Sequence, residues 1–327
     1  IIHRATGAYC RTIADRGLFD LSEGFSKFLR EGGAVPDNLA GLLPFLAAEI
    51  LRGRKVVIFP EGGMVKDRRV LDNVGEFNIF SPSSLAYRKH HQGAAVLALT
   101  LELFKNRIQD LIRNGDAKRL THWRQALGIE STEALIVQVQ RPTLIVPATI
   151  TFYPIRISDN ILSRTIEKFD KKMTEGIVEE LDVERNIILR ETDMDIRLGE
   201  AISPQKKRRW NWLYTILLKR YFFTINSLHG LFGLKEHAHG LCERLLAHFI
   251  TIESRRIRDV YMQRVYAGVT VNLSHLASDL IMTWVKRRRM EVPAYEFHRV
   301  LYLVVKKLQK ELDVHIHHGI DVPVNYR

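Results

Sequence analysis

The most constraining feature of the sequence is a short apolar run that ends abruptly at a proline and two glycines. Residues 55–63 read KVVIFPEGG. A β-branched run of this length, bounded by Pro and Gly, predicts a buried strand of a parallel sheet. Such a strand would deliver the Glu61 carboxylate and a flexible turn to the sheet edge at which open α/β sheets usually bind ligands.

Helical and strand-like segments alternate through the first two-thirds of the chain. The spacing of apolar residues predicts helices over residues 39–52 and 93–104, and strands over 143–153 and 195–198. Helices between strands favour an α/β fold, in which a mixed sheet is covered by helices. The segment 105–140 is charged and helical in character, so we predict that it is a helical insertion on the surface of this domain.

The final third of the sequence has a different character. Residues 206–209 read KKRR, and the segments that follow have helical patterns, most clearly over 243–266 and 294–312. We therefore predict two domains. The first is an α/β domain over residues 1–204, and the second is a basic α-helical domain over residues 205–327.

Charge is distributed unevenly between these two parts. The net charge is +12, and from residue 204 onwards 21 Lys and Arg residues face 10 Asp and Glu, against 28 and 27 in the first 203 residues. A one-sided basic field implies an anionic partner, which could be nucleic acid, an acidic membrane or an acidic carrier protein. No apolar run in the sequence reaches the roughly 18–20 residues that a membrane-spanning helix needs.

Several common site types lack support in the sequence. Two cysteines cannot form a disulfide framework, so we expect a reducing, cytoplasmic setting. His315, His317 and His318 lie close together but have no carboxylate at ligand spacing, so we predict no metal site. Neither a Gly-x-Ser-x-Gly elbow nor a phosphate-binding Gly-x-x-x-x-Gly-Lys loop is present, which argues against the common hydrolase and nucleotide-binding classes.

Five segments together resemble a known family. Residues 59–63 (FPEGG) resemble the Phe-Pro-Glu-Gly-Thr-Arg block of the glycerol-phosphate and lysophosphatidate acyltransferase family. Four other segments resemble blocks of that family and follow its order, namely residues 28–35 (FLREGGAV), 93–99 (GAAVLAL), 144–150 (LIVPATI) and 196–202 (IRLGEAI). The resemblance covers about the first 203 residues. Residues 269–276 (VTVNLSHL) look like the C-terminal region of some glycerol-3-phosphate acyltransferases.

The resemblance implies an enzyme of phospholipid biosynthesis. It would move a fatty acyl group from acyl-CoA or acyl-carrier protein to a hydroxyl of glycerol-3-phosphate or a lysophospholipid, without a cofactor. The family's general base belongs to a His-x-x-x-x-Asp motif. None of the thirteen histidines here has Asp five positions later. We therefore expect no catalytic residue within this chain, the motif upstream of Ile1, and no acyl transfer by the 327-residue chain alone.

The resemblance also assigns roles to particular residues. Glu61 and the turn after it would shape the acceptor site, three nearby cations would hold the acceptor's phosphate, and Val146 and Pro147 would support the pocket wall. The predicted substrate-binding residues are Phe59, Pro60, Glu61, Gly62, Gly63, Lys66, Arg68 and Arg69. The chain departs from the family in having Gly63 where Thr is usual, with no Arg directly after it. The second block likewise has residues 36–38 (PDN) in place of its usual Arg.

Other interpretations fit the same residues. The FPEGG block is compatible with an ordinary strand-to-loop turn followed by a solvated basic loop. The chain as a whole could be a catalytically inactive relative or a basic-tail binding or scaffold protein. The aromatic residues Trp210, Trp212 and Tyr214 beside the KKRR junction could stack nucleic-acid bases, although no nucleic-acid motif accompanies them and we expect no such partner.

The basic C-terminal third also suggests a membrane partner. We expect the protein to be cytoplasmic and peripheral on the inner face of a membrane, where Lys206 to Arg209 and Lys286 to Arg289 would contact anionic lipid. Apolar residues between Trp210 and Leu218 would anchor it in the headgroup boundary. Alternatively, these clusters are solvated faces of a helical cap.

Overall fold

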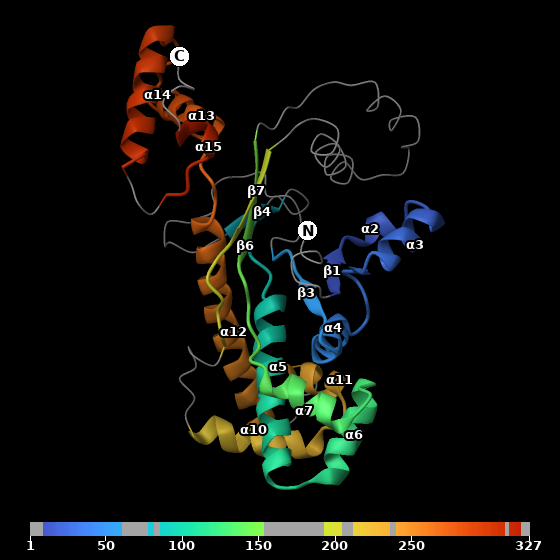
Figure 1. Ribbon diagram of the computed structural model, residues 1–327. Helices are drawn as coiled ribbons and strands as arrows, with labels where there is room; N and C mark the ends of the chain where they lie inside the picture. Colours follow the sequence, from blue (N-terminus) through green and yellow to red (C-terminus); the bar gives the residue numbers. More distant parts are fainter. Residues whose placement is uncertain are drawn as a thin grey trace. The chain divides into compact units, whose positions relative to one another are not determined.

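The computed structural model describes residues 9–60, 78–81, 86–153, 193–204, 212–235, 240–310 and 314–321 (Figure 1). The chain folds into two compact units. Unit 1 contains residues 1–145 and 201–262, and unit 2 contains residues 146–200 and 263–327. Each unit includes residues from both sides of position 204, at which the sequence predicts a domain boundary.

Unit 1 contains a small parallel sheet with the strand order β2-β1-β3. Its strands are β1 (Cys10–Ala14), β2 (Ala34–Pro36) and β3 (Lys55–Val57), and Thr12 of β1 is opposite both Ala34 and Val57. Helices α2 (Arg16–Phe19) and α3 (Glu23–Glu31) connect β1 to β2, and α4 (Leu42–Leu51) connects β2 to β3. These helical crossovers allow neighbouring strands to run in the same direction.

The expected helix over 39–52 is confirmed as α4, and the expected strand after it is confirmed as the parallel strand β3. Pro44 is the third residue of α4, where a missing backbone N–H breaks no helical hydrogen bond. The expectation that β3 is buried is wrong. Lys55 is exposed and Val56 and Val57 are only half-buried, because among the described strands β3 pairs with β1 alone and forms an edge of the sheet.

The core of unit 1 is built mainly from helices. Helix α5 (Gly93–Arg113) packs against α4, α6 (Ala117–Leu127) and α7 (Thr132–Gln140), as Figure 1 shows. The ring of Phe104 on α5 lies 4.9 Å from that of Trp123 on α6, and Trp123 stacks on Phe222 of α10 (Trp212–Thr224) at 5.7 Å between ring centroids. Short helices α11 (Leu228–Phe232) and η1 (Gly233–Lys235) follow α10.

The segment 105–140 is helical, as predicted, but its predicted surface location is wrong. Ile108, Trp123 and Leu135 are buried in the same core cluster as Leu46 and Leu51 of α4. Apolar residues recur at helical spacing along this segment, so one side of each helix faces the core. Most of its charged residues stay at least partly exposed, but Lys105 and Arg107 of α5 are buried. The segment is therefore a main part of the unit 1 core.

Unit 2 combines a strand pair with helices. Strands β6 (Ala148–Tyr153) and β7 (Asp193–Leu198) are antiparallel, with Ile150 opposite Ile196. They are followed in the chain by α13 (Leu273–Lys286), α14 (Ala294–Leu308) and α15 (His318–Asp321). The long helix α12 (Leu241–Ala267) contributes residues to both units.

The α/β character and the helical C-terminal region are confirmed, as are strands within 143–153 and at 195–198. The expectation of one mixed sheet is wrong for the part of the chain that is described. Its strands form three separate sheets, β2-β1-β3, β6-β7 and the hairpin of β4 (Asn78–Ser81) with β5 (Ala86–Lys89). Helix α12 matches the pattern expected over 243–266, and α14 matches most of the one over 294–312. Within the described ranges, no helix has the combination of length and apolar character that crossing a bilayer requires.

Candidate functional site

The carboxyl edge of the parallel sheet is the first candidate site. The three strands end near Ala14, Pro36 and Val57. Asp15 and Asp37 are exposed and directly follow β1 and β2. The backbone N–H of Asp37 donates to the Ala14 carbonyl at 3.0 Å, and Oδ1 of Asp37 accepts from the Arg16 N–H at 3.2 Å. Two carboxylates thus lie at the edge where open α/β sheets usually bind ligands.

Neither aspartate is predicted as a site residue from the sequence. Asp37 belongs to residues 36–38, at which the chain departs from the family pattern. Asp15 also caps α2, since its Oδ1 accepts from the Gly17 N–H at 2.6 Å. An acidic residue immediately after a strand is the sequence signal by which both could have been found.

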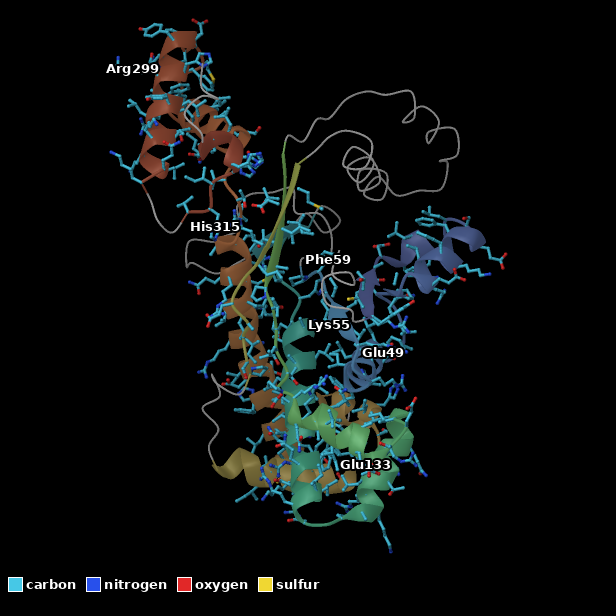
Figure 2. All side chains as sticks on the ribbon, in the orientation of Figure 1. Glu49, Lys55, Phe59, Glu133, Arg299 and His315 are labelled. Carbon is cyan, nitrogen blue, oxygen red and sulfur yellow. The ribbon has the colours of Figure 1, made fainter. Side chains whose placement is uncertain are left out.

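The chain leaves β3 through Phe59 and Pro60, the first two residues of the FPEGG block. Phe59, which is labelled in Figure 2, is 55% exposed. The Pro60 carbonyl accepts a hydrogen bond from the His91 backbone N–H at 3.0 Å, and the His91 carbonyl accepts one from the Tyr261 hydroxyl at 2.9 Å. Burial raises the pKa of Tyr261, so its phenol stays protonated as this donor. The exit from β3 is therefore held beside the start of α5 and against α12.

Most of the predicted acceptor-binding residues follow this exit. Glu61, Gly62, Gly63, Lys66, Arg68 and Arg69 lie outside the described residues. Of the predicted set, the described part of the chain contains Phe59 and Pro60, both at the carboxyl edge of the sheet as expected. The buried His90 precedes His91 next to this exit. No pattern in the sequence distinguished His90 from the other histidines.

The predicted pocket-wall residues Val146 and Pro147 belong to unit 2, whereas Phe59 and Pro60 belong to unit 1. Pro147 is buried, and its carbonyl accepts from the Gly199 N–H at 2.8 Å. Val146 is 49% exposed and precedes β6 by two residues.

An apolar face of the β6–β7 pair continues from Val146. Because side chains alternate along a strand and register places Ile150 opposite Ile196, one face carries a row of aliphatic residues. Its exposed members are Ile150, Met194, Ile196 and Leu198. The opposite face is polar and packed. There Thr149 donates to the Val265 carbonyl at 2.5 Å, and a hydrogen bond from Thr270 lowers the pKa of Asp195.

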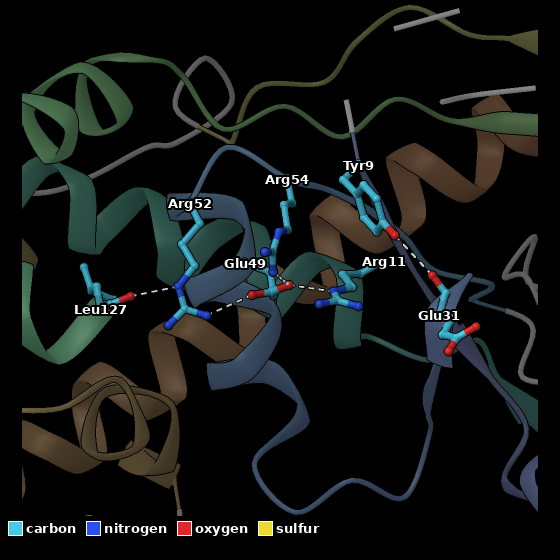
Figure 3. Close-up of polar contacts among 7 residues, drawn as sticks. All are labelled: Tyr9, Arg11, Glu31, Glu49, Arg52, Arg54 and Leu127. Atoms are coloured by element: carbon cyan, nitrogen blue, oxygen red, sulfur yellow. Dashed lines mark hydrogen bonds and ion pairs between the residues drawn. The ribbon is translucent and has the colours of Figure 1, made fainter. Parts of the chain in front are cut away.

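A second polar cluster in unit 1 surrounds the buried carboxylate of Glu49 on α4 (Figure 3). Its Oε2 accepts from Nε of Arg11 at 2.6 Å and from Arg54, and its Oε1 accepts from Nη1 of Arg52 at 2.9 Å. Nε of Arg52 also donates to the Leu127 carbonyl at 2.8 Å. Burial by itself would raise the pKa of Glu49, but the hydrogen bonds from the three arginines lower it to about 2.

This cluster connects secondary-structure elements and is not part of the candidate site. Arg11 lies near the start of β1 and Arg54 immediately precedes β3, so the cluster lies toward the amino ends of the strands. The candidate site lies at their carboxyl ends. Glu49 connects α4 to β1, while Arg52 connects α4 to the end of α6. We therefore interpret the cluster as fixing the sheet to the helical core.

The histidines near the chain end do not gather ligands around a common point. His317 is buried, its Nδ1 accepts from the Gly319 N–H at 3.1 Å, and its ring lies 4.2 Å from that of His318. His315 is exposed. Among the described residues, no group of three or more His, Cys, Asp or Glu side chains could hold a metal ion.

Of the two basic clusters expected to contact a membrane, one lies within the described residues. Residues 206–211 lie outside the described residues, as do the side chains of Trp212 and Tyr214. Lys286 to Arg289 are described, and all four are exposed at the end of α13.

No protein-family model matches the chain, and no significant similarity to a curated protein or to a solved structure is found. A function must therefore be argued from the residues and from the geometry around them.

Proposed function

We propose that the chain is part of a glycerophospholipid acyltransferase. It would move a fatty acyl group from acyl-CoA or acyl-carrier protein to a hydroxyl of glycerol-3-phosphate or a lysophospholipid. One observation carries the proposal: β3 is a parallel strand whose carboxyl end leads directly into the FPEGG block, beside the start of α5. Ligands of α/β sheets usually bind at this edge, and the first turn of a helix favours the negative charge of a phosphate.

The proposed reaction is direct transfer between a thioester and an alcohol. A histidine of the His-x-x-x-x-Asp motif, expected upstream of Ile1, removes the proton of the acceptor hydroxyl while the aspartate orients its ring. The alkoxide oxygen attacks the thioester carbonyl, the new ester bond forms, and the thiol leaves with a proton. No covalent enzyme intermediate is needed.

Within this chain, the proposed roles concern acceptor binding. Glu61 and the two glycines after it shape the acceptor site, and Lys66, Arg68 and Arg69 hold the phosphate. The apolar face that continues from Val146 along β6 and β7 offers aliphatic contacts suited to an acyl chain.

The test requires the full-length protein with its natural start. Transfer of labelled acyl groups from acyl-CoA and from acyl-carrier protein would be measured with glycerol-3-phosphate and with lysophosphatidate as acceptors. Glu61→Ala should lower turnover by about a hundredfold, the usual effect of losing one positioned polar group. The matched control is Glu130→Ala, since Glu130 is an exposed acid on the loop between α6 and α7.

Three outcomes would contradict the proposal in different ways. Absence of transfer by the full-length protein with every donor and acceptor would favour an inactive relative or a scaffold. Near-normal turnover by Glu61→Ala at all acceptor concentrations would leave the FPEGG block as an ordinary turn. Transfer catalysed by the 327-residue chain alone would refute the upstream location of the general base.

A membrane is part of the proposed setting because the acceptors and products are lipids or their precursors. The protein works peripherally on the inner face of a membrane, with its basic C-terminal third toward anionic lipid. The excess of 21 basic over 10 acidic residues in that third supports this.

A further inference from the structure

The turn between α13 and α14 combines consecutive cations with large exposed apolar side chains. Lys286, Arg287 and Arg288 are exposed, and none forms an ion pair with the described residues. Met290 and Tyr295 are 74% and 72% exposed, among the highest values for large apolar residues in the described chain. Solvent-exposed apolar side chains bordered by charge commonly mark an interaction surface.

The turn has a defined shape that exposes these cations. Arg288 has a φ of 57°, and it is the only residue other than glycine with positive φ in the described part of the chain. The helix end is closed by hydrogen bonds from the Arg288 N–H to the Val285 carbonyl at 2.9 Å and from the Arg289 N–H to the Trp284 carbonyl at 2.9 Å. Glycine is the usual residue at this left-handed position, because a Cβ there costs free energy. Arg288 thus adopts a backbone conformation that is unfavourable for a residue with a Cβ. Such conformations often occur at functional sites.

Arg289 differs from its neighbours because it braces the turn. Its Nη1 and Nη2 donate to the two carboxylate oxygens of Glu296, both at 2.6 Å, and its guanidinium lies 5.9 Å from the centre of the Trp284 ring. This double hydrogen bond ties the end of α13 to the start of α14. The charge of the exposed surface therefore comes from the other three cations, Lys286, Arg287 and Arg288.

The charge of the whole helical hairpin has the same sign. Residues 273–310 contain eight Lys and Arg against three Asp and Glu. One of those three acids, Glu296, is engaged by Arg289, so the turn faces solvent with a net positive field.

From these observations we infer that the α13–α14 turn docks the protein on an anionic lipid bilayer. Met290 and Tyr295 enter the boundary between headgroups and acyl chains, while Lys286, Arg287 and Arg288 contact lipid phosphates. Tyrosine is enriched at that boundary because its ring is apolar and its hydroxyl is polar. The biological purpose of this docking rests on the proposed acyl transfer, but the binding itself does not.

A bilayer fits this surface better than nucleic acid does. Nucleic-acid grooves use aromatic platforms between cations, which would leave Met290, the more exposed of the two apolar side chains, without a partner. In a bilayer that side chain is buried in hydrocarbon. The apolar contribution also predicts binding that raised salt weakens but does not abolish.

The inference can be tested with the 327-residue chain by co-sedimentation with vesicles. Neutral phosphatidylcholine vesicles would be compared with vesicles containing about a third phosphatidylglycerol, at low and at raised salt. The binding free energy that each cation contributes near such a surface changes the partitioning of the protein onto vesicles about fivefold. Arg288→Asn should therefore weaken binding to the anionic vesicles about fivefold, and removing all three cations should weaken it about a hundredfold. Met290→Ser should weaken binding at both salt concentrations.

Two comparisons separate docking from a structural role. Arg288→Gly relieves the left-handed conformation, so the variant should unfold at an unchanged or higher urea concentration while its binding falls. Lys307→Gln removes an exposed charge twelve residues beyond Tyr295 on α14. That spacing is about 18 Å along a helix, well beyond the screening length of about 8 Å, so its binding should be unchanged.

Several results would overturn the inference. These are equal partitioning to neutral and anionic vesicles, equal losses for Arg288→Asn and Lys307→Gln, or retention of a single-stranded oligonucleotide in place of vesicles. Acyl transfer can be assayed separately in the full-length protein, with glycerol-3-phosphate and a short-chain acyl-CoA, since neither requires a bilayer. If the full-length protein binds anionic vesicles but catalyses no transfer, the proposed function alone is rejected. If it catalyses transfer but does not bind the vesicles, the docking surface alone is rejected.

Discussion

Replacing Glu49 by glutamine should destabilise unit 1 by about 3 kcal/mol at neutral pH. The Glu49 side chain is 1% exposed, and three guanidinium groups donate to its carboxylate. Glutamine keeps the size of the side chain but removes its charge, which leaves Arg11, Arg52 and Arg54 close together without an anion. Removing one partner of a buried ion pair typically costs about 3–5 kcal/mol. We expect the lower end, because the arginine side chains are 22–37% exposed and water screens part of their repulsion.

The pH dependence gives an independent value for the same interaction. The pKa of Glu49 falls from its ordinary value of 4.5 to about 2 in the folded state. Because the folded-state pKa is the lower one, the stabilisation is fully present above pH 4.5 and is lost as the pH falls toward 2. A shift of this size corresponds to about 3 kcal/mol. The stability difference between the wild-type chain and Glu49→Gln should therefore narrow over that pH range.

Urea unfolding followed by far-UV circular dichroism would measure this difference, and hydrogen exchange of residues 42–57 would locate it. A loss of about 3 kcal/mol should lower the urea midpoint by at least about 1 M. Asp20→Asn is the control, because it removes an acid from the exposed Arg16–Asp20 pair in the same unit and should have little effect. If Glu49→Gln unfolds like the control at pH 7, or if its deficit persists unchanged at pH 3, the electrostatic account of the cluster is wrong.

Two further predictions concern packing and backbone conformation in unit 1. Phe104→Ala should lower the free energy of unfolding by about 3–5 kcal/mol in the same urea assay, since Phe104 is fully buried. Phe28→Ala, at a ring 67% exposed, should change it little, and equal effects would contradict the assigned core. Gly33→Ala should loosen β1 and β2, because Gly33 has a φ of 90° and a Cβ there would lie 2.4 Å from the Cys10 carbonyl oxygen. Faster hydrogen exchange of residues 10–14 would reveal this, and unchanged exchange would refute it.

The candidate site was predictable from the sequence only in its local part. The FPEGG block follows an apolar run bounded by Pro and Gly, so the sequence alone predicted that Phe59 and Pro60 leave a parallel strand at its carboxyl end. The contact between Pro60 and His91 was not predictable, nor was the position of Asp37 beside Ala14. Both pair residues from different elements, and no short-range pattern records such a pairing.

The sequence by itself determined the features that depend on neighbouring residues. The presence of a helix within residues 39–52, of a strand that begins at Lys55 and of the helices of the C-terminal third follows from apolar spacing, Pro and Gly. The tertiary structure alone decided which helices form the core. Residues 105–140 are charged enough to suggest a surface insertion, but Trp123 is buried against Phe104 and Phe222. It also decided that Glu49 meets Arg11, 38 residues away. The physical reason is that burial and ion pairing depend on what surrounds a side chain in space, whereas periodicity states only which side of its own helix it occupies.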